Sequence, residues 1–453
     1  MRKTLPVVLV AFITYLLLAY LLVGHWLYAP LLTNFAVLHA ALFAHLCLKV
    51  TASVAARPHD PVPGYDYDSL RVDVVVPVYN EDPALLAAGI RALAAQDRLP
   101  DHVWLVDDGS QNDGEPFLVL ETVAVADAVQ AARAAGITVH SIRQTNQGKR
   151  WAQKVAFRAS EADIFVTIDS DTYLDPRAIG KLLLPFANDD VQSVAGMACG
   201  QNYRKSILTR AIDLGFTMAF IQGRLAEGFF GQVRVNCGIL AAYRGDVVRD
   251  NLPRYLNQHF FDVPVKAGDD RALTYFAKER GRTECQIEAI AYSALPESLG
   301  HLVRQRMRWA RSWCWGTLLL LRRPVTTGDF WFTFTQLVGI FGFGTILLLA
   351  TAGLVLGAVS PSLLVNALVL TFVIGAVMHL RYVVIAHPHE PLHQRLLTWM
   401  FSPVATMLYI GMTLPLYFVA MLTPRPQKTW GTRRTVEVRL HSVPGRIESE
   451  AAA

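Results

Sequence analysis

Residues 72–81 read Val-Asp-Val-Val-Val-Pro-Val-Tyr-Asn-Glu, a β-branched run that ends in polar side chains. Three further strand-like runs follow along the chain, at Val103–Asp107, Ile137–Ser141 and Ile164–Asp169. The segments between them, such as Pro83–Ala95 and Phe117–Ala135, have the apolar spacing of helices. Strands that alternate with helices are typical of βαβ units, so the sequence predicts an α/β domain with a mostly parallel sheet.

Polar clusters stand where these strands end, which is where parallel sheets bind ligands. They are Tyr79-Asn80-Glu81, Asp107-Asp108-Gly109-Ser110 and Asp169-Ser170-Asp171, and Gln147-Gly148-Lys149-Arg150 precedes a helix-like segment. Any one of them could be only a turn, and their joint recurrence is the informative feature. The sequence contains neither GxGxxG nor GxxxxGK[ST]. A nucleotide would therefore need carboxylates and a divalent cation, Mg²⁺ or Mn²⁺. In Asp169-Ser170-Asp171, one carboxylate could take the metal while the other meets sugar or base.

Three stretches contain no Asp, Glu, Lys or Arg, at residues 4–48, 330–380 and 396–424. The remaining residues carry charge at about the density of an ordinary soluble domain, roughly a quarter. About 20 apolar residues cross a bilayer as a helix. The sequence therefore predicts a soluble domain, residues 57–299, inserted between transmembrane segments at 1–56 and 330–424.

Basic residues set the expected orientation of these segments. Arg2 and Lys3 precede the first stretch and Lys49 follows it, so residues 1–56 should form a hairpin with both ends in the cytoplasm. A cleaved signal peptide is the alternative for the first span. Phe330–Val359 and Leu363–Leu380 predict two further spans. The last stretch is interrupted by Pro403 and Pro415, so a re-entrant or broken hairpin should keep the tail, 425–453, cytosolic.

Composition narrows the other possibilities. A net charge of +5, with basic residues gathered beside apolar segments, argues against a nucleic-acid partner. The five cysteines form no CxxC pair, which predicts neither a zinc site nor a disulfide framework and fits a reducing cytosol. Residues 300–329 interleave arginines with tryptophans and predict a helix at the membrane surface. His387, His389 and His393 show no ligand spacing and are expected to be solvated.

In this order, Val-Pro-Val-Tyr-Asn-Glu, Asp-Asp-Gly-Ser, Gly-Lys-Arg and Asp-Ser-Asp resemble the GT-A core of family 2 inverting glycosyltransferases, which has a Rossmann-like sheet. Gly268-Asp269-Asp270-Arg271 and Gln305-Arg306-Met307-Arg308-Trp309 resemble the carboxylate and QxxRW motifs of the processive branch. Trp430-Gly431-Thr432-Arg433 resembles the WGTR element of hyaluronan synthases and their relatives. The resemblance runs from about Val72 to Arg433. It implies a multi-pass enzyme of the cell membrane whose catalytic domain is cytoplasmic.

The resemblance also implies a role for each motif residue. Asp270 would be the general base, with Asp269 beside it, and Asp171 with Asp169 would bind the metal. Donor-binding residues would be Pro77, Tyr79, Glu81, Asp107, Asp108, Lys149, Arg150 and Asp169. Acceptor- and diphosphate-binding residues would be Cys237, Gly238, Arg271, Gln305, Arg308, Trp309, Trp430 and Arg433. Without the other motifs, Asp269 and Asp270 could equally be plain helix caps.

The resemblance implies the type of reaction but leaves more than one product possible. Gly-Asp-Asp-Arg is similar to hyaluronan synthases, and Arg308-Trp309-Ala310-Arg311-Ser312 is similar to chitin-oligosaccharide synthases. Those two groups share the donor UDP-N-acetylglucosamine. The expected partners are a UDP-sugar, the growing polysaccharide and membrane lipid. Alternatives are a non-processive transferase that modifies a lipid, a glucan synthase that uses UDP-glucose, and a transporter or scaffold with an inactive transferase core. Relatives often have Ser-Gly-Pro or Cys-Gly-Pro where this sequence has Cys237-Gly238-Ile239.

Overall fold

The structure is a computed structural model of the chain. It describes residues 36–321, apart from 113, 261–262 and 266, then isolated positions between 330 and 357, and finally residues 361–423. The first predicted span, Leu5–Gly24, lies outside these residues, as do Trp430 and Arg433.

A sheet of eight strands in the order β5-β2-β1-β6-β9-β8-β12-β7 forms the centre of the α/β domain. One half is parallel and follows the strand runs expected from the sequence. Its strands are β1 (Val72–Val78), β2 (His102–Asp107), β5 (Thr138–Arg143) and β6 (Ile164–Thr167). Their carboxyl ends carry the polar clusters, which therefore meet at one edge of the sheet.

The other half of the sheet is mixed, so the expectation of a mostly parallel sheet needs correction. Its strands are β9 (Ala241–Arg244), β8 (Val191–Gly200), β12 (Arg282–Ser293) and β7 (Tyr173–Leu174). β9 runs antiparallel to both β6 and β8, and β7 runs antiparallel to β12, while β8 and β12 are parallel. β9 enters the middle of the sheet after a long helical excursion, and its short apolar sequence gives no sign of strand direction. Two small hairpins, β3–β4 (Gln111–Asn112, Glu115–Pro116) and β10–β11 (His259–Phe260, Val263–Pro264), lie outside the sheet.

Helices cover both faces of the sheet because successive strand residues point to opposite sides. On β1, Val74 and Val76 pack into a core with α3 (Pro83–Ala94) and α4 (Val123–Ala134). Val75 points the other way, into a core with α5 (Lys149–Ala159) and α11 (Asp269–Arg280). Shorter helices complete the layers at α6 (Ala178–Leu183), α9 (Gly245–Asp250) and α10 (Leu252–Leu256), with 3-10 turns at Val119–Glu121 and Leu184–Ala187.

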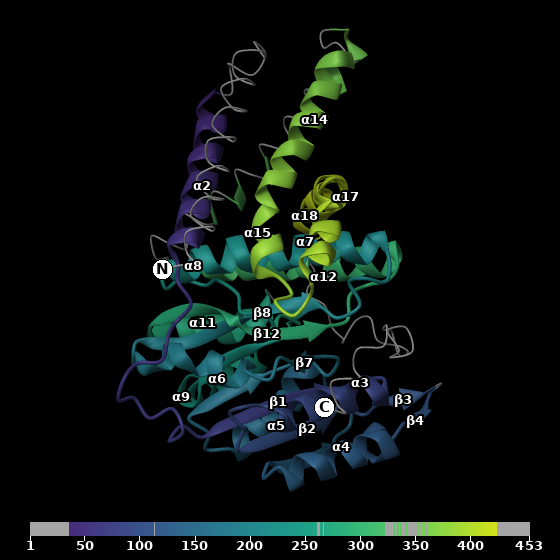
Figure 1. Cartoon of the computed structure of the whole chain (residues 1–453). Coiled ribbons are helices and arrows are strands. Elements are labelled where there is room, and N and C mark those ends of the chain that lie inside the picture. The colour runs from purple at the N-terminus through teal and green to yellow at the C-terminus, as the bar shows by residue number, and fades with distance from the viewer. Residues whose placement is uncertain are drawn as a thin grey trace.

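Two long amphipathic helices lie between this domain and the apolar helices (Figure 1). The first is α7 (Ile207–Met218), which continues through a π-helical turn, η4 (Ala219–Arg224), into α8 (Leu225–Phe229). The second is α12 (Leu299–Leu321), which carries the Gln305 and Trp309 motif. The second helix lies within residues 300–329, where the sequence predicts a helix.

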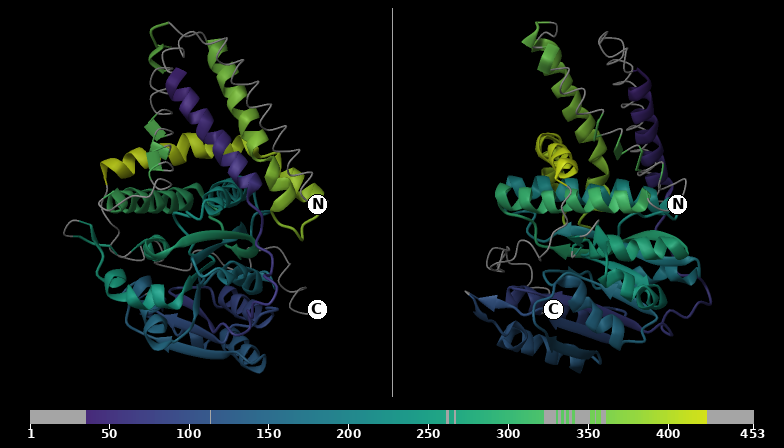
Figure 2. Two further views of the ribbon diagram at one scale, coloured as in Figure 1. Left: turned by 90° about the vertical axis from the view of Figure 1, so that its left-hand side faces the viewer. Right: turned by 180° about the vertical axis from the view of Figure 1, so that it is seen from behind.

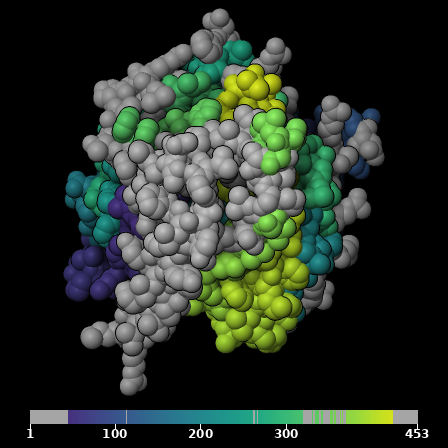
Figure 3. Space-filling view, turned by 90° about the horizontal axis from the view of Figure 1, so that it is seen from above, coloured from purple at the N-terminus to yellow at the C-terminus, as the bar shows by residue number. Residues whose placement is uncertain are grey.

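Two apolar helices, α2 (Ala36–Ala55) and α14 (Pro361–Met378), project from the catalytic domain in the same direction (Figures 1 and 2). The chain then returns through α15 (Leu380–Ile385) and α16 (Leu392–Trp399). Seen from above, residues of these C-terminal helices form much of the described surface at this end (Figure 3).

The last apolar stretch differs from the predicted hairpin. It is one helical run made of α17 (Ser402–Leu408), a π-helical segment η5 (Tyr409–Thr413) and α18 (Leu414–Leu422). Pro403 lies in its first turn, where a proline costs no hydrogen bond, and Pro415 follows the π-helical segment. Within the described residues it is the one helix long and apolar enough to cross a membrane, judged by length and composition. Figure 2 shows it lying across α2 and α14, not alongside them.

Candidate active site

A cavity of about 1180 Å³ opens at the carboxyl ends of the parallel strands. Its floor contains Pro77 and Glu81 after β1, Lys149 at the start of α5, Asp169 to Asp171 after β6, and Asp269 to Arg271 at the start of α11. Gln305, Arg308 and Trp309 of α12 form one wall. The cavity therefore brings together residues that are far apart in the sequence.

Lys149 lies between two carboxylates that belong to different segments. Its Nζ is 2.7 Å from Asp169 Oδ1 and 2.9 Å from Asp269 Oδ2. Burial opposes its charge, but the two carboxylates outweigh burial and hold the pKa of Lys149 well above its ordinary value. The ammonium group is thus a fixed positive charge at the base of the cavity.

Gly238 lies directly over this ion pair. A Cβ at this position would be 3.1 Å from Lys149 Nζ and 3.6 Å from both carboxylate oxygens of Asp169. The absence of a side chain therefore leaves the charged groups open to the cavity. Burial raises the pKa of the neighbouring Cys237 thiol to about 12, so this cysteine is a packing residue without thiolate character.

The two acids at the start of α11 have opposite pKa shifts. For Asp269, burial is outweighed by Lys149 and then Arg150, which hold the pKa of this carboxyl below its ordinary value. For Asp270, burial and the negative charge of Asp269 raise the pKa. Neighbouring carboxyls whose environments separate their pKa values are typical of acid–base pairs. Asp270 is the one suited to accept a proton.

Backbone conformation fixes where these two acids begin their helix. Gly268 precedes α11 with φ +74°, in the left-handed region that favours glycine. A Cβ on Gly268 would also lie 2.7 Å from Ser312 Oγ and 2.9 Å from Trp315 Cζ2 of α12. Close contact between the α11 start and α12 is what places Asp270 beside the wall that carries Trp309.

Arg150 does not line the cavity, although it was expected beside the diphosphate. Its guanidinium is buried and donates to the Tyr255 carbonyl and Gln258 Oε1, and to the carbonyls of Ala267 and Gly268. Arg150 therefore holds, through hydrogen bonds to its carbonyl groups, the backbone segment that precedes Asp269. A charged residue after a turn gives the same sequence signal whether it faces a ligand or the interior.

Asp107 and Asp108 are likewise absent from the cavity lining, although the resemblance implies that they bind the donor. Asp107 Oδ1 accepts from the Ser110 N–H and hydroxyl, and burial raises the pKa of this carboxyl. Asp108 accepts from the backbone N–H groups of Gln147 (3.0 Å) and Gly148 (2.7 Å) and from the Gln144 amide. It fastens the loop before α5, so Lys149 is positioned by it.

The donor set beside Asp171 fits a divalent cation. Asp169 and Asp171 both line the cavity, and Asp171 Oδ1 accepts a hydrogen bond from Ser293 Oγ at 3.2 Å. Among the described residues, no group of three or more acidic, histidine or cysteine side chains could hold an ion alone. Mg²⁺ and Mn²⁺ commonly take one or two carboxylates and complete their shell with substrate phosphates. The residues present suit that arrangement.

The aromatic wall is held by neighbouring helices. The Trp309 ring stacks on Phe216 of α7 with centroids 5.8 Å apart, and the Arg306 guanidinium lies 4.7 Å from the Trp309 centroid. These contacts fix the Trp309 ring, and Trp309 also lines the cavity.

Comparison with known proteins agrees with this arrangement. The sequence model of the family described as "Glycosyltransferase like family 2" matches residues 70–312. A hyaluronan synthase of Streptococcus pyogenes is 31% identical over 404 residues, which cover 88% of this chain and 90% of that one. The chain belongs to glycosyltransferase family 2.

Further relatives of this glycosyltransferase agree. An N-acetylglucosaminyltransferase of Sinorhizobium fredii is 38% identical over 253 residues, covering 55% of this chain and 59% of that one. A mannosyltransferase from Pyrobaculum calidifontis, solved with GDP-Man and Mn²⁺, has a TM-score of 0.54 at 18% identity and covers 84% of this chain and 97% of its own. The last likeness supports the GT-A fold.

Sequence reasoning missed a second polar group in the cavity of this glycosyltransferase. Glu227 is buried and accepts from Arg234 Nε at 2.9 Å and from Arg234 Nη2 at 2.7 Å. Arg234 Nη1 donates to Gln336 Oε1 at 3.0 Å. Arg234 and its hydrogen bonds hold the pKa of Glu227 below its ordinary value in spite of burial. Opposite charges seven residues apart across a loop give little signal in a single sequence.

Proposed function

We propose that this chain is a processive, inverting β-glycosyltransferase that polymerises sugars from UDP-activated donors and passes the product across the membrane. The observation that carries the proposal is the shape of the cavity. It runs from Lys149 and Asp270 to apolar helices, with Leu46 of α2, Met378 of α14 and Tyr409 of η5 in its lining. A transferase that used its helices only as anchors would have no need for a cavity that continues among them.

The reaction follows from the acids at the start of α11. Asp270, with its raised pKa, takes the proton from the acceptor hydroxyl as that oxygen bonds to the anomeric carbon of the donor. The bond from the anomeric carbon to the diphosphate breaks on the opposite side, and the electron pair leaves with the nucleoside diphosphate. Attack from one face and departure from the other invert the configuration.

The remaining residues position the reactants. Trp309 offers its face to the acceptor sugar, with Gln305 and Arg308 beside it on α12. Asp171 and Asp169 would hold Mn²⁺ or Mg²⁺, which would neutralise charge on the departing diphosphate. Trp430 and Arg433 are assigned to diphosphate closure by resemblance. That role requires the tail to lie on the same side of the membrane as the catalytic domain, which we propose is cytoplasmic.

Two relatives favour UDP-N-acetylglucosamine as the donor, since one is named an N-acetylglucosaminyltransferase and the other a hyaluronan synthase. A multi-pass arrangement in the cell membrane is supported by α2 and α14, which project together. The last helical run lies across these two helices.

The deciding experiment is a donor screen on the purified full chain in lipid nanodiscs with Mn²⁺. UDP-N-acetylglucosamine is supplied alone and then together with UDP-glucuronic acid, and products are sized by gel. We expect long chains under at least one condition. Transfer of single sugars to lipid under both conditions would refute processivity, and no transfer under either condition would refute UDP-N-acetylglucosamine as the donor. The topology is tested by placing a cysteine at Ser442. Labelling of this cysteine by an impermeant maleimide added to intact cells would refute a cytoplasmic tail.

A further inference from the structure

The loop of residues 386–391, between α15 and α16, docks on the catalytic domain, and we call it the docking loop. Three of its residues meet a charged partner there: His387 meets Asp213, His389 meets Asp175, and Glu390 meets Arg204. The expectation that these histidines are solvated is therefore wrong for His387, which is 2% exposed. His393, on α16, is exposed.

The His387 contact is built into the interior. Asp213 of α7 is fully buried and accepts from His387 Nε2 at 2.8 Å, from the Tyr382 hydroxyl at 2.5 Å and from the Gly200 N–H at 2.6 Å. One carboxylate thus joins α15, the docking loop and the end of β8. His387 has φ +47°, a conformation that non-glycine residues rarely adopt and that the surrounding contacts must maintain.

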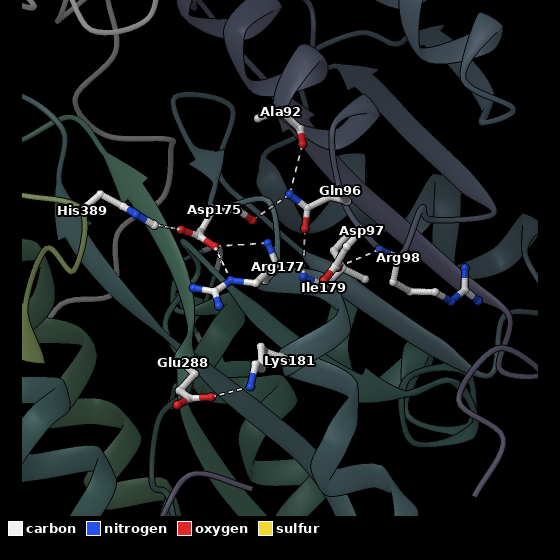
Figure 4. Close-up of polar contacts among 10 residues, drawn as sticks. All are labelled: Ala92, Gln96, Asp97, Arg98, Asp175, Arg177, Ile179, Lys181, Glu288 and His389. Atoms are coloured by element: carbon white, nitrogen blue, oxygen red, sulfur yellow. Dashed lines mark hydrogen bonds and ion pairs between the residues drawn. The ribbon is translucent and has the colours of Figure 1, made fainter. Parts of the chain in front are cut away.

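The His389 contact reaches the segment after β6 that carries Asp169 and Asp171. His389 Nε2 lies 2.6 Å from Asp175 Oδ2, and the Asp175 carboxylate is 3% exposed (Figure 4). On the other side of the same residue, the Gln96 amide donates to the Asp175 carbonyl at 2.8 Å. Figure 4 shows Asp175 held between the docking loop and the end of α3.

Asp175 is the last residue of the segment 169–175, which we call the carboxylate segment because it contains Asp169 and Asp171. Ser170 of this segment donates to Glu81 at 2.6 Å, and Asp171 accepts from Ser293 of β12. Those two contacts come from the catalytic domain itself. The contact with His389 comes instead from the docking loop, which follows α14 and α15 in the chain.

We propose that His389, acting through Asp175, is a positioning residue that couples the C-terminal apolar helices to the carboxylate segment. The proposal rests on the proposed function, because it assigns Asp169 and Asp171 to the donor diphosphate and its cation. A shift of α14 and α15, which bound the product path, would be transmitted through the docking loop to the acids that hold the donor. Synthesis and movement of the product would thereby be linked.

The test measures hydrogen exchange in the full-length protein in nanodiscs. His389→Ala removes the donor to Asp175 Oδ2 and leaves the Arg177 contacts with Asp175 Oδ1 in place. We expect exchange of peptides covering residues 169–175 to rise at least about fivefold, as the loss of a hydrogen bond to a charged group implies. His389→Gln keeps an N–H donor and should restore wild-type exchange. His393→Ala is the matched control, because that histidine is exposed on the neighbouring helix. Peptides covering β2 report on general stability.

Each result decides the proposal. Unchanged exchange of residues 169–175 in His389→Ala overturns it, and so does a uniform rise that includes β2, because that indicates general destabilisation. Failure of His389→Gln to restore protection also overturns it. A second readout is binding of Mn²⁺ with UDP followed by electron paramagnetic resonance, where His389→Ala should raise the half-saturating Mn²⁺ concentration about threefold to tenfold. If the wild-type protein binds no Mn²⁺ with UDP, the metal assignment in the proposed function fails, while hydrogen exchange still decides the coupling.

Discussion

Replacing Asp270 with Asn should lower the activity of the protein and raise its stability. Asn is nearly the same size but accepts no proton, so the acceptor hydroxyl must be deprotonated without a base. General base catalysis contributes about 10²–10⁴-fold, which corresponds to about 2.7–5.4 kcal/mol of barrier. We therefore expect the polymerisation rate at saturating UDP-sugar to fall by about 10²–10⁴-fold, with little change in donor affinity.

The stability effect follows from the direction of the pKa shift. Burial and the charge of Asp269 raise the pKa of Asp270, so the folded state disfavours its ionised form. A folded pKa above the unfolded value means that stability is lost as pH rises through that window. Where Asp270 is ionised, the wild-type protein carries this cost and Asp270→Asn does not. The variant should therefore unfold at a higher temperature than the wild-type protein.

The assays are radiolabelled sugar incorporation and thermal unfolding in the same detergent. Asp169→Asn is a useful comparison, because it removes a partner of Lys149 without removing the base. Retention of more than about a tenth of the wild-type rate by Asp270→Asn would place the base elsewhere. A lower unfolding temperature would refute the electrostatic reasoning about this pair of acids.

Three further predictions concern the surroundings of the same acids. Arg150→Met should lower the free energy of unfolding by about 3–5 kcal/mol, because it leaves buried carbonyl acceptors unpaired. Chemical unfolding measures this change, and an unfolding midpoint equal to that of the wild-type protein would contradict a structural role for Arg150. Gly268→Ala should abolish incorporation in a protein that still reaches the membrane, since its Cβ collides with Ser312; wild-type activity would show that α11 can shift freely. Asp269→Asn should move the acidic limb of the pH–rate profile to lower pH, because the charge that raises the pKa of Asp270 is gone; a limb that moves upward would reverse that assignment.

Much of the fold followed from local pattern. β1 begins and ends where the β-branched run does, at Val72 and Val78, and the parallel half of the sheet was expected from the alternation of strands and helices. The mixed half was not expected. β9 pairs with both β6 and β8, and the sequence of its four residues does not indicate this pairing. Strand direction is set by where the chain re-enters the sheet.

The candidate site shows the same division. The positions of Asp169, Asp269 and Lys149 around one cavity agree with motifs read in order along the chain. Sequence alone could not tell that Arg150 and Asp108 face inward, since buried and ligand-facing charges share one local pattern. His387 was misjudged because its partner, Asp213, is 174 residues away in the chain.

The continuity of the cavity has a consequence for how this protein can be divided. A fragment that stopped after α12 would lack Met378, Tyr409 and Tyr417, and so one side of the chamber above Trp309 would be open to solvent. The same cut would expose the buried Asp213 carboxylate, whose donors His387 and Tyr382 lie beyond it. The catalytic and apolar halves are therefore not interchangeable modules. Exchanging either half with a homologue's should require moving its matching contacts as well.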